Sequence, residues 1–337
     1  MYKPIRNFKF TLSILTALLS SFLYAQPKPL PQILVKENLF VNTYGETIVF
    51  HGFSTSDPYK LQADNQWNKR YFQEIKNWGA NAVRFPVHPA NWRTLGKDSY
   101  LKLLDQGIHW ATELQLYVII DWHSIGNLKT EKFFRPSYKT TKKETREFWQ
   151  TMAKQYGKHS TVAFFELFNE PVNNGEFGNC TWAEWKAIVE EIITVIRAEG
   201  ALNIPLVAGF NWGYDLSEAA GNPVNAAGIA YVSHPYPMKR EKPWEDKWNK
   251  DWGLMANHYP IILTEIGFSG EEEKGAHIPV ISNESYGDAI TAYCNQNGIS
   301  YIVWCFDPDW NPMLIRDWDF NTTRQGEYFK QVLSEKK

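Results

Sequence analysis

Cysteine is scarce in this sequence: Cys180, Cys294 and Cys305 are the only three among 337 residues. An odd and small number excludes a scaffold held by several disulfides, because at most one bridge can form within the chain. The wide spacing of the three also lacks the close pairs of a structural zinc site. We therefore expect buried or free thiols rather than a metal or disulfide framework.

The chain also has no large net charge of either sign. The formal net charge is −2, with 35 basic and 37 acidic residues, so nothing in the charge indicates nucleic acid as a partner. The sequence has no low-complexity tract, no linker and no appended binding module, and no feature of it indicates an oligomer. We expect a monomer with one globular domain over residues 26–337.

A long apolar run occurs only near the start of the chain. Three basic residues within the first nine precede an apolar stretch from Phe10 to Tyr24, and a polar, proline-rich sequence follows Ala25. This is the pattern of a secretory signal peptide over residues 1–25. We expect cleavage after Ala25, an extracellular or periplasmic location, and no membrane attachment of the mature chain. Leu23 is larger than usual for such a site, and an uncleaved anchor is the alternative, although the run is short for a spanning helix.

Aromatic residues are abundant. The 15 tryptophans and 17 tyrosines exceed what a core requires. Indole and phenol rings pack on the apolar faces of sugars while their polar tips form hydrogen bonds, so a carbohydrate ligand is one interpretation. Aromatic filling of a large core is the other.

Apolar runs of strand length alternate with amphipathic segments along the rest of the chain. The runs show no polar alternation, which indicates strands covered on both faces, as in parallel α/β sheets. The eight expected strands are Thr47–Ser54, Ala82–Val87, Leu116–His123, Val162–Glu170, Pro205–Phe210, Ile229–His234, Pro260–Ile266 and Ser300–Phe306. The expected helices are Trp67–Trp78, Tyr100–Glu113, Lys143–Tyr156, Trp182–Glu199, Tyr286–Asn297 and Gln325–Ser334. Eight such units predict a single (β/α)₈ TIM barrel.

Polar residues lie where the predicted strands end, at the face of such a barrel that carries active sites. They are Arg84, Asp121, His123, Asn169, Glu170, His234, Tyr236, Glu265 and Trp304. Glu170 and Glu265 end strands four and seven, which lie across the barrel from each other. Two facing carboxyl groups suit glycoside hydrolysis, in which one protonates the leaving oxygen while the other attacks or activates water.

The neighbouring residues can serve the same reaction. Arg84 and Tyr236 are placed to donate to Glu265, which would keep it ionised as a nucleophile. Asn169 can hydrogen-bond a sugar 2-hydroxyl, a contact that strengthens in the transition state. Trp304 can form the floor under the sugar ring.

Together these residues resemble glycoside hydrolase family 5, the cellulase-type family of the large retaining (β/α)₈ clan. The matching positions, in order along the strands, are Arg84, His123, Asn169-Glu170, His234-Pro235-Tyr236, Glu265 and Trp304. The resemblance covers residues 26–337. It implies a catalytic domain in which Glu170 is the acid/base and Glu265 the nucleophile, with retention of configuration and no cofactor. It also implies a cis peptide bond at Trp304-Cys305.

The implied substrate is a β-linked polysaccharide or oligosaccharide. An endo-acting β-1,4-glucanase of the cellulase type is the first interpretation, and a β-mannanase or another β-glycan hydrolase is the alternative. A catalytically silent carbohydrate-binding barrel is the alternative from another class, against which the presence of both glutamates argues. Retaining chemistry requires the two carboxyl groups to lie about 5–5.5 Å apart.

Other residues received separate interpretations. Glu166 is expected to be a core carboxylate paired with a cation, and Asp121 to support His123. Among histidines, His51 could line the pocket and His88 could lie on its rim. The strand-one segment His51-Gly52-Phe53 lacks the second histidine common in metal-dependent barrel hydrolases, so no metal is expected.

The tryptophans outside that set divide into two groups. Trp122, Trp212 and Trp310 lie at or just beyond strand ends and are candidate sugar-binding rings, with Trp310 expected as a wall of the cleft. Trp244, Trp248 and Trp252 recur every four positions, and such a stripe more often packs in a core than binds sugar.

Overall fold

The computed structural model describes residue 1 and residues 29–335, so the expected signal peptide and its cleavage site at Ala25 lie outside the described residues, apart from Met1. Within this described part of the chain, no helix combines the length and the apolar character needed to cross a membrane.

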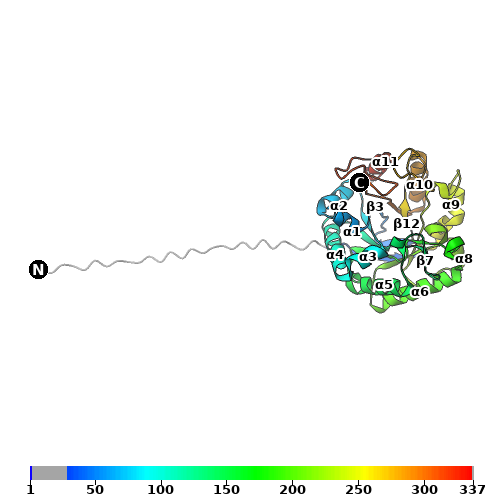
Figure 1. The fold of residues 1–337 in the computed structure, drawn as a ribbon, viewed down its shortest axis with the longest axis horizontal. Helices are drawn as coiled ribbons and strands as arrows, with labels where there is room; N and C mark the ends of the chain where they lie inside the picture. Colours follow the sequence, from blue (N-terminus) through cyan, green and yellow to red (C-terminus); the bar gives the residue numbers. More distant parts are fainter. Residues whose placement is uncertain (2–28, 336–337) are drawn as a thin grey trace.

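Eight parallel strands close into a barrel, which confirms the predicted fold class (Figure 1). They are β3 (His51–Ser54), β4 (Ala82–Val87), β5 (Tyr117–Trp122), β8 (Val162–Glu166), β10 (Ile204–Ala208), β11 (Ala230–Val232), β12 (Ile261–Ile266) and β13 (Ser300–Val303). Both ends of each strand lie within four residues of the ends of the corresponding expected strand. The strands are almost wholly buried because helices cover their outer faces, which is why their sequences read as continuous apolar runs.

Helices surround the barrel (Figure 1). The long ones, α2 (Lys69–Asn77), α4 (Lys97–Glu113), α5 (Lys142–Tyr156), α6 (Trp182–Ala198), α10 (Glu284–Asn297) and α11 (Arg324–Ser334), match the expected segments. Side-chain oxygens cap the amino-terminal ends of three of these helices. Thr181 and Glu184 form a reciprocal capping box at α6, and Thr141 and Thr323 cap α5 and α11.

Short helices that the sequence did not predict lie in the connections. They are α1 (Pro58–Ala63), α3 (Pro89–Leu95), α7 (Phe210–Gly213), α8 (Ser217–Gly221) and α9 (Glu245–Asp251), with 3₁₀ turns η1 (Pro136–Tyr138), η2 (Gly175–Phe177), η3 (Pro237–Lys239) and η4 (Gly253–Asn257). Each spans too few residues to show a helical period clearly.

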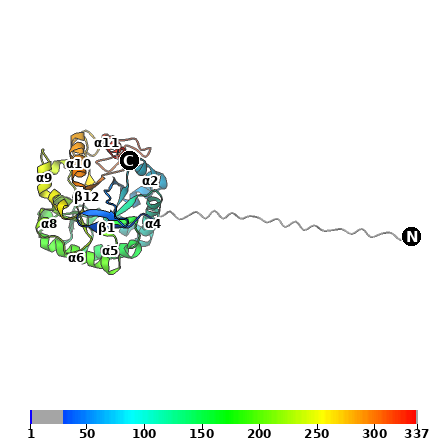
Figure 2. The ribbon, with the colours of Figure 1, turned by 180° about the vertical axis from the view of Figure 1, so that it is seen from behind.

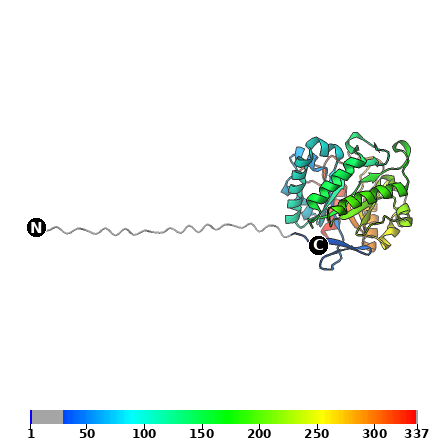
Figure 3. The ribbon, with the colours of Figure 1, turned by 90° about the horizontal axis from the view of Figure 1, so that it is seen from below.

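A hairpin of β1 (Ile33–Lys36) and β2 (Leu39–Asn42) covers one end of the barrel (Figures 2 and 3). Ile33 and Phe40 pack with Phe50 and Phe164 from inside the barrel, and the rings of Phe40 and Phe164 meet edge to face at 5.2 Å. These contacts are with residues early in their strands or just before them, so the hairpin closes the amino-terminal end. The carboxyl-terminal end remains the side on which a site can form.

The expected strand Val162–Glu170 is two strands. Its first part, β8, belongs to the barrel, whereas β9 (Glu170–Pro171) pairs with β6 (Ile125–Asn127) in a small separate sheet that also contains β7 (Lys132–Phe133). Glu170 thus leaves the barrel wall and is held at its rim by backbone pairing with the loop that follows β5.

The three cysteines are buried as thiols, as expected. Trp244, Trp248 and Trp252 are also buried, at 6%, 1% and 1% exposure, and pack beside α10. The core interpretation of this tryptophan stripe is therefore confirmed.

Candidate active site

Glu170 and Glu265 face each other at the carboxyl-terminal end of the barrel. Oxygen atoms of the two carboxyl groups, together with a ring nitrogen of His234, all lie within 4.8 Å of one another. Both glutamates are nearly buried, at 8% and 5% exposure. This close spacing agrees with the retaining arrangement, because inverting enzymes separate the pair by about 6.5–9.5 Å to admit a water molecule.

Arg84, from the middle of β4, organises the floor of the site. Its guanidinium binds Glu166 through two hydrogen bonds of 2.7 and 3.1 Å, and it also donates to Glu265 at 3.0 Å and to Asn169 at 2.6 Å. Burial lowers the pKa of Arg84, but Asp121, Glu166 and Glu265 together raise it well above its usual value. The cation is therefore permanent and holds three side chains at fixed angles.

Glu166 is a buried carboxylate paired with a cation, as predicted. Burial raises the pKa of Glu166, yet the charges of Arg84 and His234 outweigh burial and lower that pKa to about 2. The group is therefore ionised at neutral pH.

Glu265 receives a hydrogen bond on each oxygen. Arg84 donates to Oε1 at 3.0 Å, and the Tyr236 hydroxyl donates to Oε2 at 2.8 Å. Both expected donors are present, but they offset burial only in part: burial raises the pKa of Glu265, against the opposing charges of His234 and Arg84. The two donors also aim the carboxylate, which has no freedom to rotate away.

His234 connects Glu170 to the floor of the site. Its Nδ1 lies 3.0 Å from Glu170 Oε1 and its Nε2 lies 2.9 Å from the hydroxyl of Thr264. Thr264 in turn donates to Glu166 at 2.8 Å. Since the hydroxyl has only one proton, which it gives to Glu166, Nε2 of His234 must be the donor to Thr264.

The protonation of His234 follows from its neighbours. Burial lowers the pKa of His234, but Glu265, Glu166 and Glu170 raise it to about 9. The ring is therefore an imidazolium at neutral pH and donates from Nδ1 to Glu170. Thr264 was not predicted as a site residue. Its place directly before Glu265 in the sequence was the available signal, but in a strand that neighbour points to the other face unless the backbone is irregular, as it is here between Leu263 and Ile266.

His123 binds Asp121, as expected, with 2.7 Å between Nδ1 and Oδ2. Burial, followed by the positive field of His88, Arg84 and His234, lowers the pKa of His123, so the ring is neutral. With Nδ1 turned to Asp121, Nε2 of His123 is left to meet a ligand. His88 is similarly fixed by Asp57, at 3.1 Å, and its ring contacts that of His123.

Trp304 and Trp310 form an aromatic wall beside these histidines. The Trp304 ring lies nearly parallel to the His123 ring at 5.3 Å and to the Trp310 ring at 5.7 Å. The Trp304-Cys305 peptide bond is cis, which confirms the prediction. Asp307 shapes the loop that carries Trp310, because its Oδ1 accepts the backbone N–H groups of Asp309 and Trp310.

Tyr138 is a site residue that the sequence analysis missed. Its ring lies 5.3 Å from that of His88 and 5.9 Å from that of His123. Burial, and then the negative charges of Glu170 and Glu265, raise the pKa of Tyr138 to about 12, so its hydroxyl lies within the field of both carboxylates. It comes from the long connection after β5, where sequence alone offers no strand end to mark it.

Trp212 lies in the turn after β10. It is half-buried, with the ring of Phe177 at 6.2 Å and the ammonium of Lys239 at 5.2 Å from its ring centroid. Trp212 follows β10, whereas Trp304 and Trp310 follow β13, and the closed strand order separates these two strands by β11 and β12.

Two expected ligand contacts are wrong. Trp122 is fully buried, stacks on Phe148 at 4.1 Å and donates to Thr145, because it points to the face of β5 opposite Asp121. His51 begins β3, at the end of the barrel away from the catalytic pair, where its ring meets that of Tyr301. The expected strand and β3 both end at Ser54, so His51 lies a strand's length short of the mouth.

The close set of Glu170, His234 and Glu265 could geometrically hold a metal ion. Its chemistry does not favour one: His234 is protonated on both nitrogens, and Arg84 and Tyr236 already donate to both oxygens of Glu265. The arrangement fits acid–base and nucleophilic chemistry instead.

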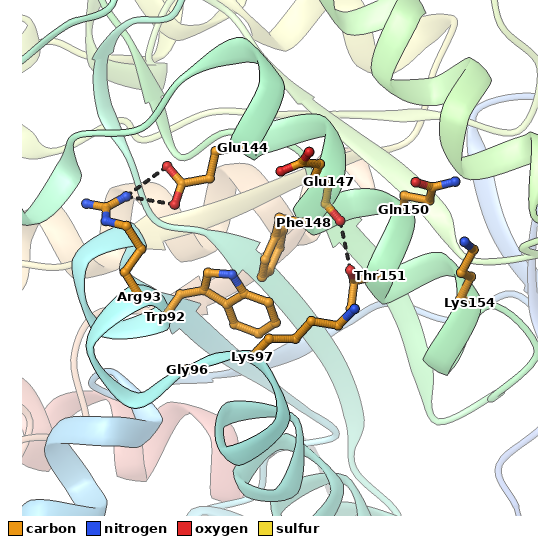
Figure 4. Close-up of a pocket in the computed structure, with 10 residues that line it drawn as sticks. All are labelled: Trp92, Arg93, Gly96, Lys97, Glu144, Glu147, Phe148, Gln150, Thr151 and Lys154. Carbon is orange, nitrogen blue, oxygen red and sulfur yellow. Dashed lines mark hydrogen bonds and ion pairs between the residues drawn. The ribbon is translucent and has the colours of Figure 1, made fainter.

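A separate groove lies on the outer surface, between α3 and α5 (Figure 4). The rings of Trp92 and Phe148 meet edge to face at 5.1 Å at its base, and Arg93 crosses it to bind Glu144 at 2.8 Å. No residue of the catalytic cluster lines this groove.

Comparison with known proteins agrees with this geometry. The model of the family described as Cellulase (glycosyl hydrolase family 5) matches residues 41–309. The chain belongs to glycosyl hydrolase family 5. Among solved structures of such enzymes, the β-glucanase SdGluc5_26A from Saccharophagus degradans, in complex with cellotetraose, is 46% identical with a TM-score of 0.91, and the match covers 92% of this chain and 95% of that one.

More distant endoglucanases are also similar. An endoglucanase from Clostridium saccharobutylicum is 31% identical over 59% of this chain but only 41% of its own length. The catalytic domain of endoglucanase Cel5A from Thermobifida fusca, at 20% identity and a TM-score of 0.73, shares the fold over 90% of this chain and 97% of that one.

Proposed function

We propose that this family 5 protein is a retaining endo-β-1,4-glucanase. The observation that carries the proposal is the paired geometry of Glu170 and Glu265: their oxygens lie within 4.8 Å, Arg84 and Tyr236 hold Glu265, and His234 holds Glu170. The S. degradans β-glucanase in complex with cellotetraose supports a β-glucan as the substrate.

In the first step, a Glu265 oxygen attacks the anomeric carbon while Glu170 gives its proton to the glycosidic oxygen. The glycosidic bond breaks, the leaving chain departs as an alcohol, and the glycosyl unit remains as an ester on Glu265. Asn169, fixed by Arg84, is placed to bind the 2-hydroxyl, and Trp304 supports the ring.

In the second step, Glu170 is a carboxylate and takes a proton from water. The water oxygen attacks the anomeric carbon, the ester to Glu265 breaks, and the configuration is retained after two inversions. His234 donates to the Glu170 carboxylate at this stage and keeps it on the side from which water enters.

The test is release of reducing sugar from carboxymethyl cellulose, mixed-linkage glucan, xyloglucan, mannan and xylan, with Glu265→Ala as the control. Release from a β-1,4-glucan that disappears in the variant supports the proposal. Release from mannan alone would replace it with a β-mannanase. Silence on every polymer, with cellotetraose binding retained, would favour a sugar-binding barrel.

We also propose that residues 1–25 direct export and that the mature protein is monomeric. The basic start, the apolar stretch and the polar sequence after Ala25 support export. Amino-terminal sequencing of exported protein should begin at Gln26, and size-exclusion chromatography with light scattering should give one chain per particle. An intact leader or a larger particle would overturn the respective statement.

A further inference from the structure

Lys239 is a half-buried lysine at the end of η3, three residues after Tyr236. Its ammonium donates to the backbone carbonyl of Asn211 at 2.9 Å and lies 5.2 Å from the centroid of the Trp212 ring. Within residues 29–335 no salt bridge engages this ammonium. Burial lowers the pKa of Lys239, while the charges of Glu170 and Glu265 act in the opposite direction. The ammonium of Lys239 thus interacts electrostatically with Glu170 and Glu265 but forms no salt bridge with either of them.

The turn that Lys239 contacts has an unusual backbone. Asn211, Trp212 and Gly213 have consecutive φ values of 58°, 54° and 68°, all in the left-handed region. Asparagine and glycine tolerate this region, but a bulky side chain such as tryptophan rarely adopts it. Such a conformation persists only where the surroundings hold it, and the hydrogen bond from Lys239 to Asn211 is one of those restraints.

The same turn packs against His234 and Asn169, which neighbour the acid/base Glu170. The backbone N–H of His234 donates to the Gly213 carbonyl at 3.1 Å. A Cβ at Gly213 would lie 3.1 Å from both the Asn169 carbonyl oxygen and Nδ1 of His234, so the turn has no room to move closer. The turn that carries Trp212 therefore packs against β9, which holds Glu170, whereas Trp304 and Trp310 follow β13.

This placement assigns a direction to the cleft. Glu170 protonates the oxygen that joins the retained sugar to the leaving chain, so the leaving chain must lie on the side of Glu170. Trp304, which faces His123, supports the sugar that becomes attached to Glu265. Trp212 and Lys239 are then the groups that a leaving glucosyl unit meets first.

We propose that Lys239 is a specificity-determining residue for the leaving chain: it holds Trp212 in its left-handed turn and donates from its ammonium to a hydroxyl of the departing glucosyl unit. The proposal rests on the proposed glucanase function. A lysine ammonium has three donors, and Asn211 uses one, so two are left for sugar hydroxyls. Sugar hydroxyls are suitable acceptors because they are uncharged and bring no further negative charge near Glu170 and Glu265.

The experiment compares two substrates whose leaving groups differ in the contacts they can make with this side of the cleft. Cellopentaose places glucosyl units against Trp212 and Lys239, whereas 2,4-dinitrophenyl β-cellobioside has a leaving group without hydroxyls that needs little acid assistance. In Lys239→Met the ratio of kcat/KM for cellopentaose to that for the aryl glycoside should fall about tenfold, the size expected for a lost hydrogen bond to a charged group. Lys239→Arg, which keeps a cation with several donors, should retain more of the ratio.

A second measurement reports the same side directly. The aryl cellobioside leaves a cellobiosyl unit as an ester on Glu265. This unit can be transferred to added cellobiose, which must bind where the leaving chain was. Lys239→Met should raise the cellobiose concentration for half-maximal transfer, again by about tenfold. Lys242→Met is the matched control: Lys242 lies in the same loop, but its ammonium donates to Ser285 of α10 at 2.7 Å and lies 4.7 Å from the Trp244 ring, so both readouts should be unchanged.

Equal loss on both substrates with normal transfer, or no change in either readout, would overturn the assignment. Wild-type protein inactive on both substrates would instead overturn the proposed function. In that case the affinity for cellopentaose, measured by calorimetry, still decides the role of Lys239: weaker binding in Lys239→Met than in Lys242→Met supports it, and equal binding overturns it.

Discussion

His234 donates its Nδ1 proton to Glu170 across 3.0 Å while its other nitrogen is committed to Thr264. The acid/base candidate is thereby tied, through His234 and Thr264, to Glu166, and Glu166 is tied through Arg84 to Glu265. The two catalytic carboxyl groups share one buried network. A substitution of Thr264 or Glu166 should therefore affect both Glu170 and Glu265.

Removing the Thr264 hydroxyl tests the first half of that network. Thr264→Val keeps the shape but leaves His234 Nε2 with only the more distant Glu166 Oε1, 3.6 Å away, so kcat on cellopentaose should fall by about tenfold. Thr264→Ser should keep most of the activity. Thr291→Val, which removes a buried hydroxyl that bonds within α10, is the control and should leave kcat unchanged. Equal kcat in the Val and Ser variants at position 264 would show that the hydroxyl has no such role.

Neutralising Glu166 tests the stability of the network. Glu166→Gln leaves the buried Arg84 cation short of one anion, and the free energy of unfolding at pH 7 should fall by about 3–5 kcal/mol. Folding lowers the pKa of Glu166 from 4.5 to about 2, so its contribution is complete above pH 4.5 and is lost as the pH falls toward 2. Urea unfolding of both proteins should show the difference shrinking over that range; a difference independent of pH would contradict the ion pair.

His234 should make the opposite contribution to the pH dependence. Folding raises the pKa of His234 from 6.5 to about 9, so its stabilisation is complete below pH 6.5 and is lost as the pH rises through 9. The difference in the free energy of unfolding between wild type and His234→Gln should therefore decline between these values. A flat difference across this range would mean that the ring is neutral in the folded protein.

The leaving-group dependence of Glu170→Ala tests the acid role. General acid catalysis contributes about 10²–10⁴-fold, so hydrolysis of β-glucan should fall by about that factor. Hydrolysis of 2,4-dinitrophenyl β-cellobioside should fall far less in its first step, because its leaving group needs little protonation. Equal losses on both substrates, measured in the pre-steady state, would contradict the assignment.

The wall formed by Trp304 and Trp310 should contribute to binding. Trp310→Ala removes a half-buried ring that contacts both Trp304 and His88, and the KM for cellopentaose should rise several-fold with a smaller change in kcat. Steady-state kinetics separate the two effects. A fall in kcat at constant KM would place Trp310 in the chemical step rather than in binding.

Two errors of sequence interpretation have definite physical causes. Trp122 follows Asp121 directly, and alternation along a strand sends neighbours to opposite faces, so the ring packs among helices while Asp121 faces the site. His51 was considered as a pocket residue because it lies in the first strand, but it stands at the start of β3 and not at its end. A shift of a few residues in a strand moves a side chain from one end of a barrel to the other.

The sequence by itself determined the eight-strand barrel, since eight apolar runs of strand length alternate with amphipathic segments, as in parallel strands covered by helices. It also determined the ordered set from Arg84 to Trp304, most of whose members lie at or just beyond a strand end. Only the tertiary structure decided how these residues act on one another. The hydrogen bond from Thr264 to Glu166, the position of Tyr138 between two histidines, and the left-handed turn that brings Trp212 to Lys239 join residues far apart in the chain. Such contacts depend on closure of the barrel and on loop conformation, which local hydrophobic patterns do not encode.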